Sequence, residues 1–135
     1  MHSTVLLALL LGTLAFMAVE CSDWPEVIGD QFIEKFKAAV ADRDEAKISD
    51  LVDKNFFFAE CHHERNREYL INYLKTLPQN SKFSITLKNA KEQAKVNVRI
   101  EVHLEGLFGM SDAAIFISNK EGTWKMIFFK ENNCE

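Results

Sequence analysis

The segment of this chain that is richest in reactive side chains lies near its middle, where Phe56–Arg65 reads FFFAECHHER. A cysteine is followed there by two histidines, and Glu60 and Glu64 stand on either side. A histidine next to a carboxylate can act as a general base, and cysteine and histidine are common zinc ligands. The residue types therefore raise two hypotheses: an isomerase- or hydrolase-like active site that uses His62 or His63 with one of the acids, and a metal site.

The spacing argues against the metal site. Zinc is held by three or four ligands in a tetrahedral arrangement, whereas neighbouring side chains on an extended backbone point in opposite directions. His62 and His63 are therefore not expected to share one ion. We expect an exposed polar loop between a strand and a helix, with no metal, no cofactor and no catalytic residue.

The N-terminal segment is typical of a secretory signal peptide. Val5–Val19 carries no charged side chain, and its length fits the roughly 7–15 residues of a signal core better than the roughly 20 of a spanning helix. We expect cleavage after Cys21, which gives a signal peptide at residues 1–21 and a single domain at residues 22–135. An uncleaved anchor is the alternative. The cleaved protein is expected to be secreted, extracellular and free of the membrane.

The cysteine count supports this boundary. The chain has three cysteines, and removal of Cys21 leaves Cys61 and Cys134 as one possible pair, which an oxidising compartment would close. Such a bridge would close a loop of roughly 70 residues, worth about 4 kcal/mol in the chain-entropy model. If cleavage instead falls before Cys21, one thiol is left for a partner chain.

The charge of the chain excludes one class of partner. The formal net charge is −4, and the sequence has no run of basic side chains. Nucleic acids and anionic membranes attract basic patches. We therefore expect no nucleic-acid partner.

The apolar spacing predicts helices in the first half of the chain and strands in the second. The expected helices begin near residues 23, 44 and 66, and the expected strands lie near residues 56–60, 83–87, 96–104, 112–118 and 123–130. Helices followed by an antiparallel meander indicate an α+β fold, with three N-terminal helices packed on one face of the sheet.

This order resembles the nuclear transport factor 2-like superfamily, in which a curved antiparallel sheet wraps around helices as a cone. Within it, the chain is similar to the small secreted single-domain members that nematodes encode. The residues that carry the resemblance are Phe32 and Phe36, Asp44, Phe56–Phe58 running into Cys61, Leu77-Pro78, Phe83-Ser84 and the terminal Cys134. A cystatin-like fold is the alternative, but it normally has one main helix and a Gln-x-Val-x-Gly loop.

The resemblance also bears on activity. Enzymes with this fold, such as ketosteroid isomerases and dehydratases, act inside the cone through titratable side chains in a dry site. The inward positions of the two expected strands near 83–87 and 96–104 carry no titratable side chain. An apolar small molecule could still bind in the cone, in a pocket formed by Phe32, Phe36, Tyr69, Tyr73, Phe83 and Trp124.

The last hairpin suggests a second binding surface. If Ser118 pairs with Thr123, then Phe116, Ile127 and Phe129 lie on the outer face of the sheet. Large apolar side chains on a wet face favour a homodimer, which the resemblance also implies, although the C-terminal tail, residues 131–135, could cover them instead. The sequence therefore predicts a secreted, non-catalytic domain that binds an apolar small molecule or a protein partner. The alternative is an enzyme that uses His62 or His63.

Overall fold

The computed structural model describes residues 24–94 and 97–134. The helices are α2 (Trp24–Asp42), α3 (Glu45–Asp50) and α4 (Arg67–Lys75). The strands are β1 (Val52–Ala59), β2 (Glu64–Asn66), β3 (Ser84–Ala94), β4 (Asn97–Glu105), β5 (Asp112–Ser118) and β6 (Lys125–Glu131). The expected signal peptide, residues 1–21, lies outside the described residues, and so does Cys21.

Side-chain caps fix where the two shorter helices begin. The Asp44 carboxylate accepts hydrogen bonds from the backbone N–H groups of Ala46 and Lys47 at 2.9 and 3.2 Å. Asn66 Oδ1 accepts one from the Tyr69 N–H at 2.9 Å. Such caps satisfy N–H groups that the first turn of a helix leaves without a partner. The sequence predicted helix starts at both capping residues.

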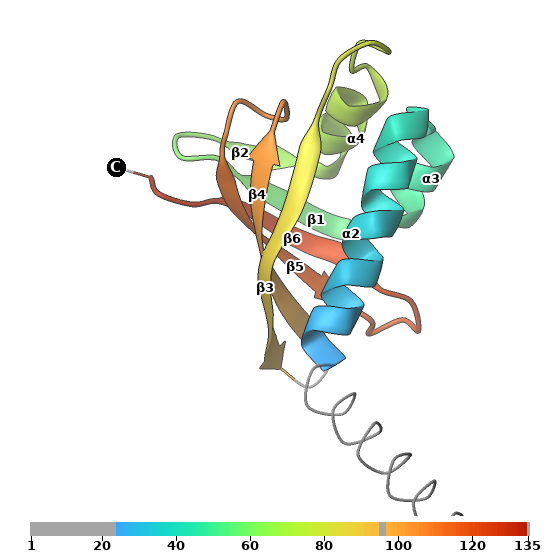
Figure 1. The fold of residues 1–135 in the computed structure, drawn as a ribbon. Helices are drawn as coiled ribbons and strands as arrows, with labels where there is room; N and C mark the ends of the chain where they lie inside the picture. The colour runs from blue at the N-terminus through green and yellow to red at the C-terminus, as the bar shows by residue number, and fades with distance from the viewer. Residues whose placement is uncertain (1–23, 95–96, 135) are drawn as a thin grey trace, which may run out of the picture.

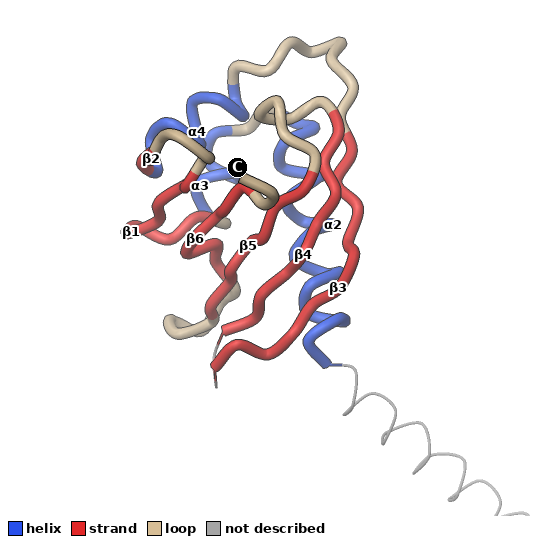
Figure 2. Tube along the Cα trace, turned by 90° about the vertical axis from the view of Figure 1, so that its left-hand side faces the viewer, coloured by secondary structure: helices blue, strands red, loops and turns tan. Residues whose placement is uncertain are grey.

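The strands form one sheet in the order β2-β1-β6-β5-β4-β3. Strands β3 to β6 make the expected antiparallel meander, whereas β1 lies parallel to β6. The helices cover one face of the curved sheet, and the other face is left open (Figures 1 and 2). This is the predicted α+β arrangement, with a parallel pairing that the sequence did not indicate.

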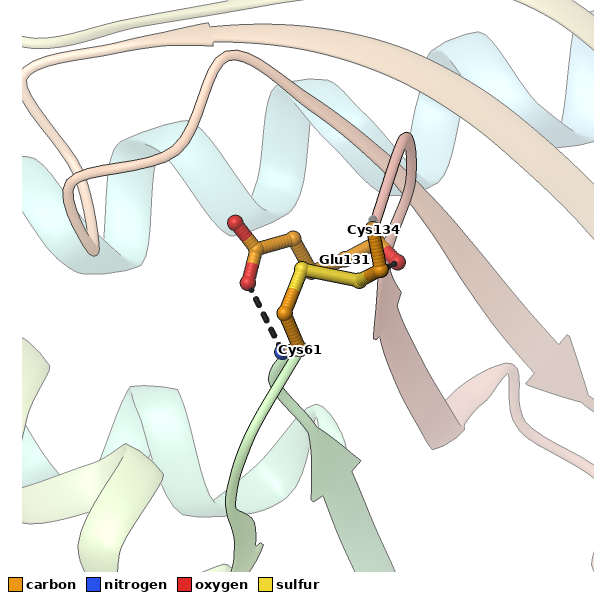
Figure 3. A group of neighbouring side chains, drawn as sticks. All are labelled: Cys61, Glu131 and Cys134. Atoms are coloured by element: carbon orange, nitrogen blue, oxygen red, sulfur yellow. Dashed lines mark hydrogen bonds between the residues drawn. A yellow bond between two sulfur atoms is a disulfide. The ribbon is translucent and has the colours of Figure 1, made fainter.

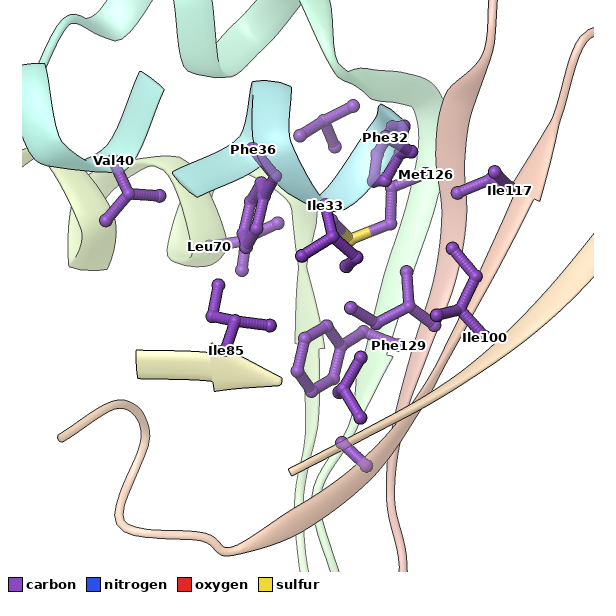
Figure 4. Close-up of a cluster of buried hydrophobic side chains, with 14 of the residues drawn as sticks. Phe32, Ile33, Phe36, Val40, Leu70, Ile85, Ile100, Ile117, Met126 and Phe129 are labelled. Atoms are coloured by element: carbon purple, nitrogen blue, oxygen red, sulfur yellow. The ribbon is translucent and has the colours of Figure 1, made fainter. Parts of the chain in front are cut away.

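One line of register partners runs across the sheet on the side that faces the helices. Phe58 of β1 lies opposite Phe129 of β6, and Ile115 of β5 and Ile100 of β4 continue the line. All four side chains are 0% exposed. Together with Phe36 from α2 they belong to a buried apolar cluster between the helices and the sheet (Figure 4). The inside of the cone is therefore occupied by side chains.

The last hairpin pairs differently from the expectation. Ser118 lies opposite Lys125 rather than Thr123. This displacement by two residues keeps side chains on their expected faces, because side chains alternate along a strand with a period of two. Met126 is accordingly inward and buried.

A bulge then overturns the expectation for the residues that follow. Between two successive pairs of the hairpin, β6 has one residue, Ile127, more than β5. An extra residue reverses the face to which every later side chain of the strand points. Phe129, which we expected on the outer face, is therefore in the core, and Phe128 lies outside in its place.

Candidate functional site

The cysteine of the FFFAECHHER segment is part of a disulfide. Cys61, just after β1, is bonded to Cys134 near the end of the chain, which is the pairing expected from the sequence. The Cys61 N–H also donates a hydrogen bond of 2.9 Å to Glu131 Oε1 (Figure 3). The three side chains bring possible ligand atoms within 4.8 Å of one another. Because the two sulfurs are bonded to each other, they are not thiolate ligands.

The two histidines lie on the exposed turn that joins β1 to β2. The Glu60 N–H donates to the His63 carbonyl at 2.8 Å and closes this turn. His62, His63 and Glu64 are all exposed, and the Glu60 carboxylate faces Arg65 at 3.7 Å. None of the hydrogen bonds found among the described residues involves either imidazole. The structure therefore places these groups on a solvated turn rather than in a pocket.

Most of the expected pocket residues belong to the core or pack against it. Phe32 and Phe36 are 3% and 1% exposed. The Tyr73 ring stacks on Phe108 at 4.5 Å, and its hydroxyl accepts a 2.7 Å hydrogen bond from the Phe108 N–H. Tyr69 in turn stacks on Tyr73. Both tyrosine rings thus pack at the edge of the core, and the Tyr73 hydroxyl is used in a structural hydrogen bond.

The remaining two residues of the expected pocket, Phe83 and Trp124, lie at opposite ends of the sheet. Phe83 is partly buried and packs against the core, with the Arg43 guanidinium 5.9 Å from its ring. Trp124 lies at the other end of the sheet and, together with Phe32, lines a groove of about 530 Å³. The groove is formed by Ile28, Gln31, Phe32, Lys35, Asp50, Leu51 and Gly122–Lys125. Of the six residues proposed for one pocket, two meet at this groove.

The outer face of the sheet carries a row of aromatic side chains. Phe57, Phe128, Phe116 and Arg99 are successive register partners on β1, β6, β5 and β4. The ring centroids of Phe57 and Phe128 are 4.4 Å apart, and those of Phe128 and Phe116 are 5.2 Å apart. The Arg99 guanidinium lies 5.4 Å from the Phe116 ring. We call these four residues the outer aromatic row.

The outer aromatic row differs from the surface that we expected. Phe116 and Ile127 are on the outer face and partly exposed, as predicted, but Phe129 is not. Phe57, which is 45% exposed, was missed. A signal for it exists in the sequence, because the middle residue of three consecutive phenylalanines in a strand must face away from its neighbours.

The described part of the C-terminal tail, up to Cys134, leaves Phe57 of this row exposed. Asn132 bonds to the Asp112 carbonyl through its N–H, and to Glu101 Oε2 through its side chain at 2.8 Å. The tail then continues to the disulfide at Cys134. The bond to Glu101, which pairs with Arg99, shows that Asn132 reaches the outer face at β4, whereas Phe57 remains 45% exposed.

The part of the outer face beyond the row is charged. Asp112 lies 3.4 Å from His103 Nδ1 and 3.3 Å from Lys88 Nζ. The hydrogen bonds from His103 and Lys88 hold the pKa of the Asp112 carboxyl below its usual value. His103 Nε2 also faces Glu105 at 3.5 Å. These groups are open to solvent, so the network fits a wet sheet surface rather than an enclosed reaction site.

Among the described residues, no helix is long and apolar enough to cross a membrane. Buried polar or charged side chains are rare among the described residues. Ser118, at 8% exposed, is the only buried polar residue in the part of the chain that the structure describes.

Comparison with known proteins agrees with this fold. Residues 26–135 match the model of the NTF2-like (nuclear transport factor 2-like) domain. No curated protein matches the chain in sequence at a significant level. An NTF2-like protein of unknown function from Shewanella baltica OS155 superposes with a TM-score of 0.61 at 8% identity, over 78% of this chain and 90% of that one.

Two further solved structures are similar to the chain. A conserved protein from Planctomyces limnophilus DSM 3776 has a TM-score of 0.62 at 12% identity, over 78% of this chain and 93% of its own. A ketosteroid isomerase candidate from Shewanella frigidimarina NCIMB 400 has a TM-score of 0.53 at 16% identity, over 76% and 93%. At such identities the likeness concerns the fold alone, and it excludes the cystatin-like alternative. By its sequence match over residues 26–135 and by its architecture, the chain belongs to the NTF2-like domain family.

Proposed function

We propose that this protein is a secreted, non-catalytic member of the family, similar to the small secreted type of nematodes, and that it acts by binding through the outer face of its sheet. The observation that carries the proposal is the outer aromatic row. Large apolar side chains that stay exposed on an otherwise charged sheet face are typical of a contact surface. The disulfide between Cys61 and Cys134 supports secretion, since disulfides persist in oxidising compartments.

The interior supports a binding role rather than catalysis. General acids and bases of enzymes with tuned pKa values stand in dry, enclosed sites. Among the described residues, the buried set holds one polar side chain, Ser118, and no titratable one. The likeness to the ketosteroid isomerase candidate concerns the fold alone, and it is therefore no evidence for the same chemistry in this chain. No geometry favours the alternative enzyme built on His62 or His63, since both lie on an exposed turn.

The occupant that fits the outer face best is a second copy of the chain. A two-fold interface brings the same patch of both subunits together, so the patch must complement itself. The outer aromatic row offers flat apolar rings, and it ends at Arg99, which pairs with Glu101 at 2.6 Å. With both signs of charge next to the rings, the arginine of one copy can meet the acid of the other at the rim. Aromatic side chains and arginine are enriched in such interfaces.

Sedimentation velocity at micromolar concentration tests this proposal. We expect a dimer for the mature protein and a monomer for Phe57→Glu, which places a charge at the β1 end of the apolar row, on its most exposed ring. Val27→Glu is the matched control, because Val27 on α2 is 46% exposed against 45% for Phe57 and lies away from the sheet. A monomeric wild-type protein, or a dimer that Phe57→Glu leaves intact, would refute self-association through this face.

A further inference from the structure

The groove lined by Trp124 lies beside the start of β6 and shares no residue with the outer aromatic row. Three parts of the chain bound it: the first half of α2, the junction between α3 and β1, and the turn before β6. Its volume of about 530 Å³ falls within the roughly 300–1,000 Å³ of pockets that hold small molecules.

The apolar side of the groove is built from residues that are only partly buried. Ile28, Leu51 and Trp124 all pack against the core and keep part of their surface open. Phe32 lies beneath them and is 3% exposed. An indole ring held against a core in this way offers a rigid apolar wall. An alkyl chain or a ring could lie along it.

The polar side of the groove carries two lysines, Lys35 on α2 and Lys125 at the start of β6. Neither ammonium lies within 4.0 Å of a carboxylate in residues 24–94 and 97–134, whereas Lys75 and Lys88, for example, are both paired. Asp50 is the one acidic residue in the lining. The groove therefore has a net positive charge beside its apolar wall.

We propose that this groove binds a small amphipathic carboxylate, such as a medium-chain fatty acid. The apolar part lies against Trp124, Leu51 and Ile28, and the carboxylate lies between Lys35 and Lys125. A neutral molecule of the same size would leave the lysines without a partner, and an inorganic anion would leave the apolar wall exposed. The combination of wall and charge thus selects a ligand with both features.

Ligand binding in the groove can be followed by the fluorescence of Trp124, because its indole ring lines the groove. The test titrates decanoate into the mature protein on a Trp24→Phe background, so that Trp124 is the single source of indole fluorescence. 1-Decanol is the neutral probe of the same chain length. We expect saturable changes in emission, with decanoate binding at least tenfold more tightly than decanol.

Charge removal then tests the role of the lysines. In Lys35→Met plus Lys125→Met, we expect decanoate to lose at least tenfold in affinity and to bind no better than decanol. Lys37→Met plus Lys82→Met removes the same charge from α2 and the loop before β3, outside the groove, and should leave decanoate binding unchanged. Circular dichroism confirms that each variant is folded.

Three results would overturn the proposal: no saturable change in emission, equal binding of decanoate and decanol to the background protein, or an equal loss in the two lysine pairs. The outcome is independent of self-association, because the groove shares no residue with the outer aromatic row. If the protein proves to be monomeric, the groove proposal still stands. If decanoate does not bind, the dimer proposal still stands.

Discussion

Replacing Phe129 and Phe128 one at a time tests the bulge that separates the structure from the simplest hairpin pairing. Phe129 is 0% exposed, and its ring stacks on Phe58 at 4.7 Å and meets Phe108 edge-on at 5.4 Å. Truncation of a core phenylalanine to alanine removes its transfer free energy and leaves a cavity, at a cost of about 3–5 kcal/mol. We therefore expect Phe129→Ala to lose this amount from the free energy of unfolding.

Phe128 provides the comparison within the same strand. It lies on the outer face, where its ring contacts Phe57 and Phe116 but stays partly exposed. Without a closed cavity, Phe128→Ala should cost about 1 kcal/mol, the typical effect of a point substitution. Because a small domain is stable by only about 5–15 kcal/mol, urea unfolding followed by circular dichroism distinguishes the two variants.

If Phe128→Ala costs as much as Phe129→Ala or more, the bulge at Ile127 is absent and the two side chains have exchanged faces. Phe129 would then replace Phe128 on the outer face, and the continuous row of rings from Phe57 through Phe128 to Phe116 would not exist.

Two further predictions concern the segment around Cys61. Replacement of both Cys61 and Cys134 by serine should lower the free energy of unfolding by about 4 kcal/mol, because the bridge closes a long loop. Peptide mapping without reduction checks the pairing, and free thiols at both positions would contradict it. His62→Ala and His63→Ala should each change stability by less than about 0.5 kcal/mol, as exposed substitutions usually do, and leave decanoate binding unaltered; loss of a bound metal or of an activity in either variant would show that the turn is functional.

Local signals explain what the sequence predicts well. The caps at Asp44 and Asn66 act on N–H groups two or three residues away, and the alternation along β4 needs only its own residues. Both can be read without knowledge of the rest of the chain. Parity alone was enough to identify the disulfide partners once Cys21 was set aside.

Signals that depend on distant segments were missed. The parallel pairing of β1 with β6 joins residues about 70 positions apart in sequence, and no local pattern indicates it. The bulge at Ile127 is decided by which phenylalanine the core accepts, so the alternation of β6 by itself gave the wrong face for Phe129. The groove likewise combines α2 with a turn near the other end of the chain.

The same bulge connects the full interior with the proposed outer function. It turns Phe129 inward, where its ring stacks on the buried Phe58. By turning Phe128 outward, it joins Phe57 to Phe116 in one continuous row. The bulge thus decides which of the two phenylalanines packs in the core and which lies beside Phe57 and Phe116 on the outer face. For this chain, the external surfaces are the places where binding should be sought.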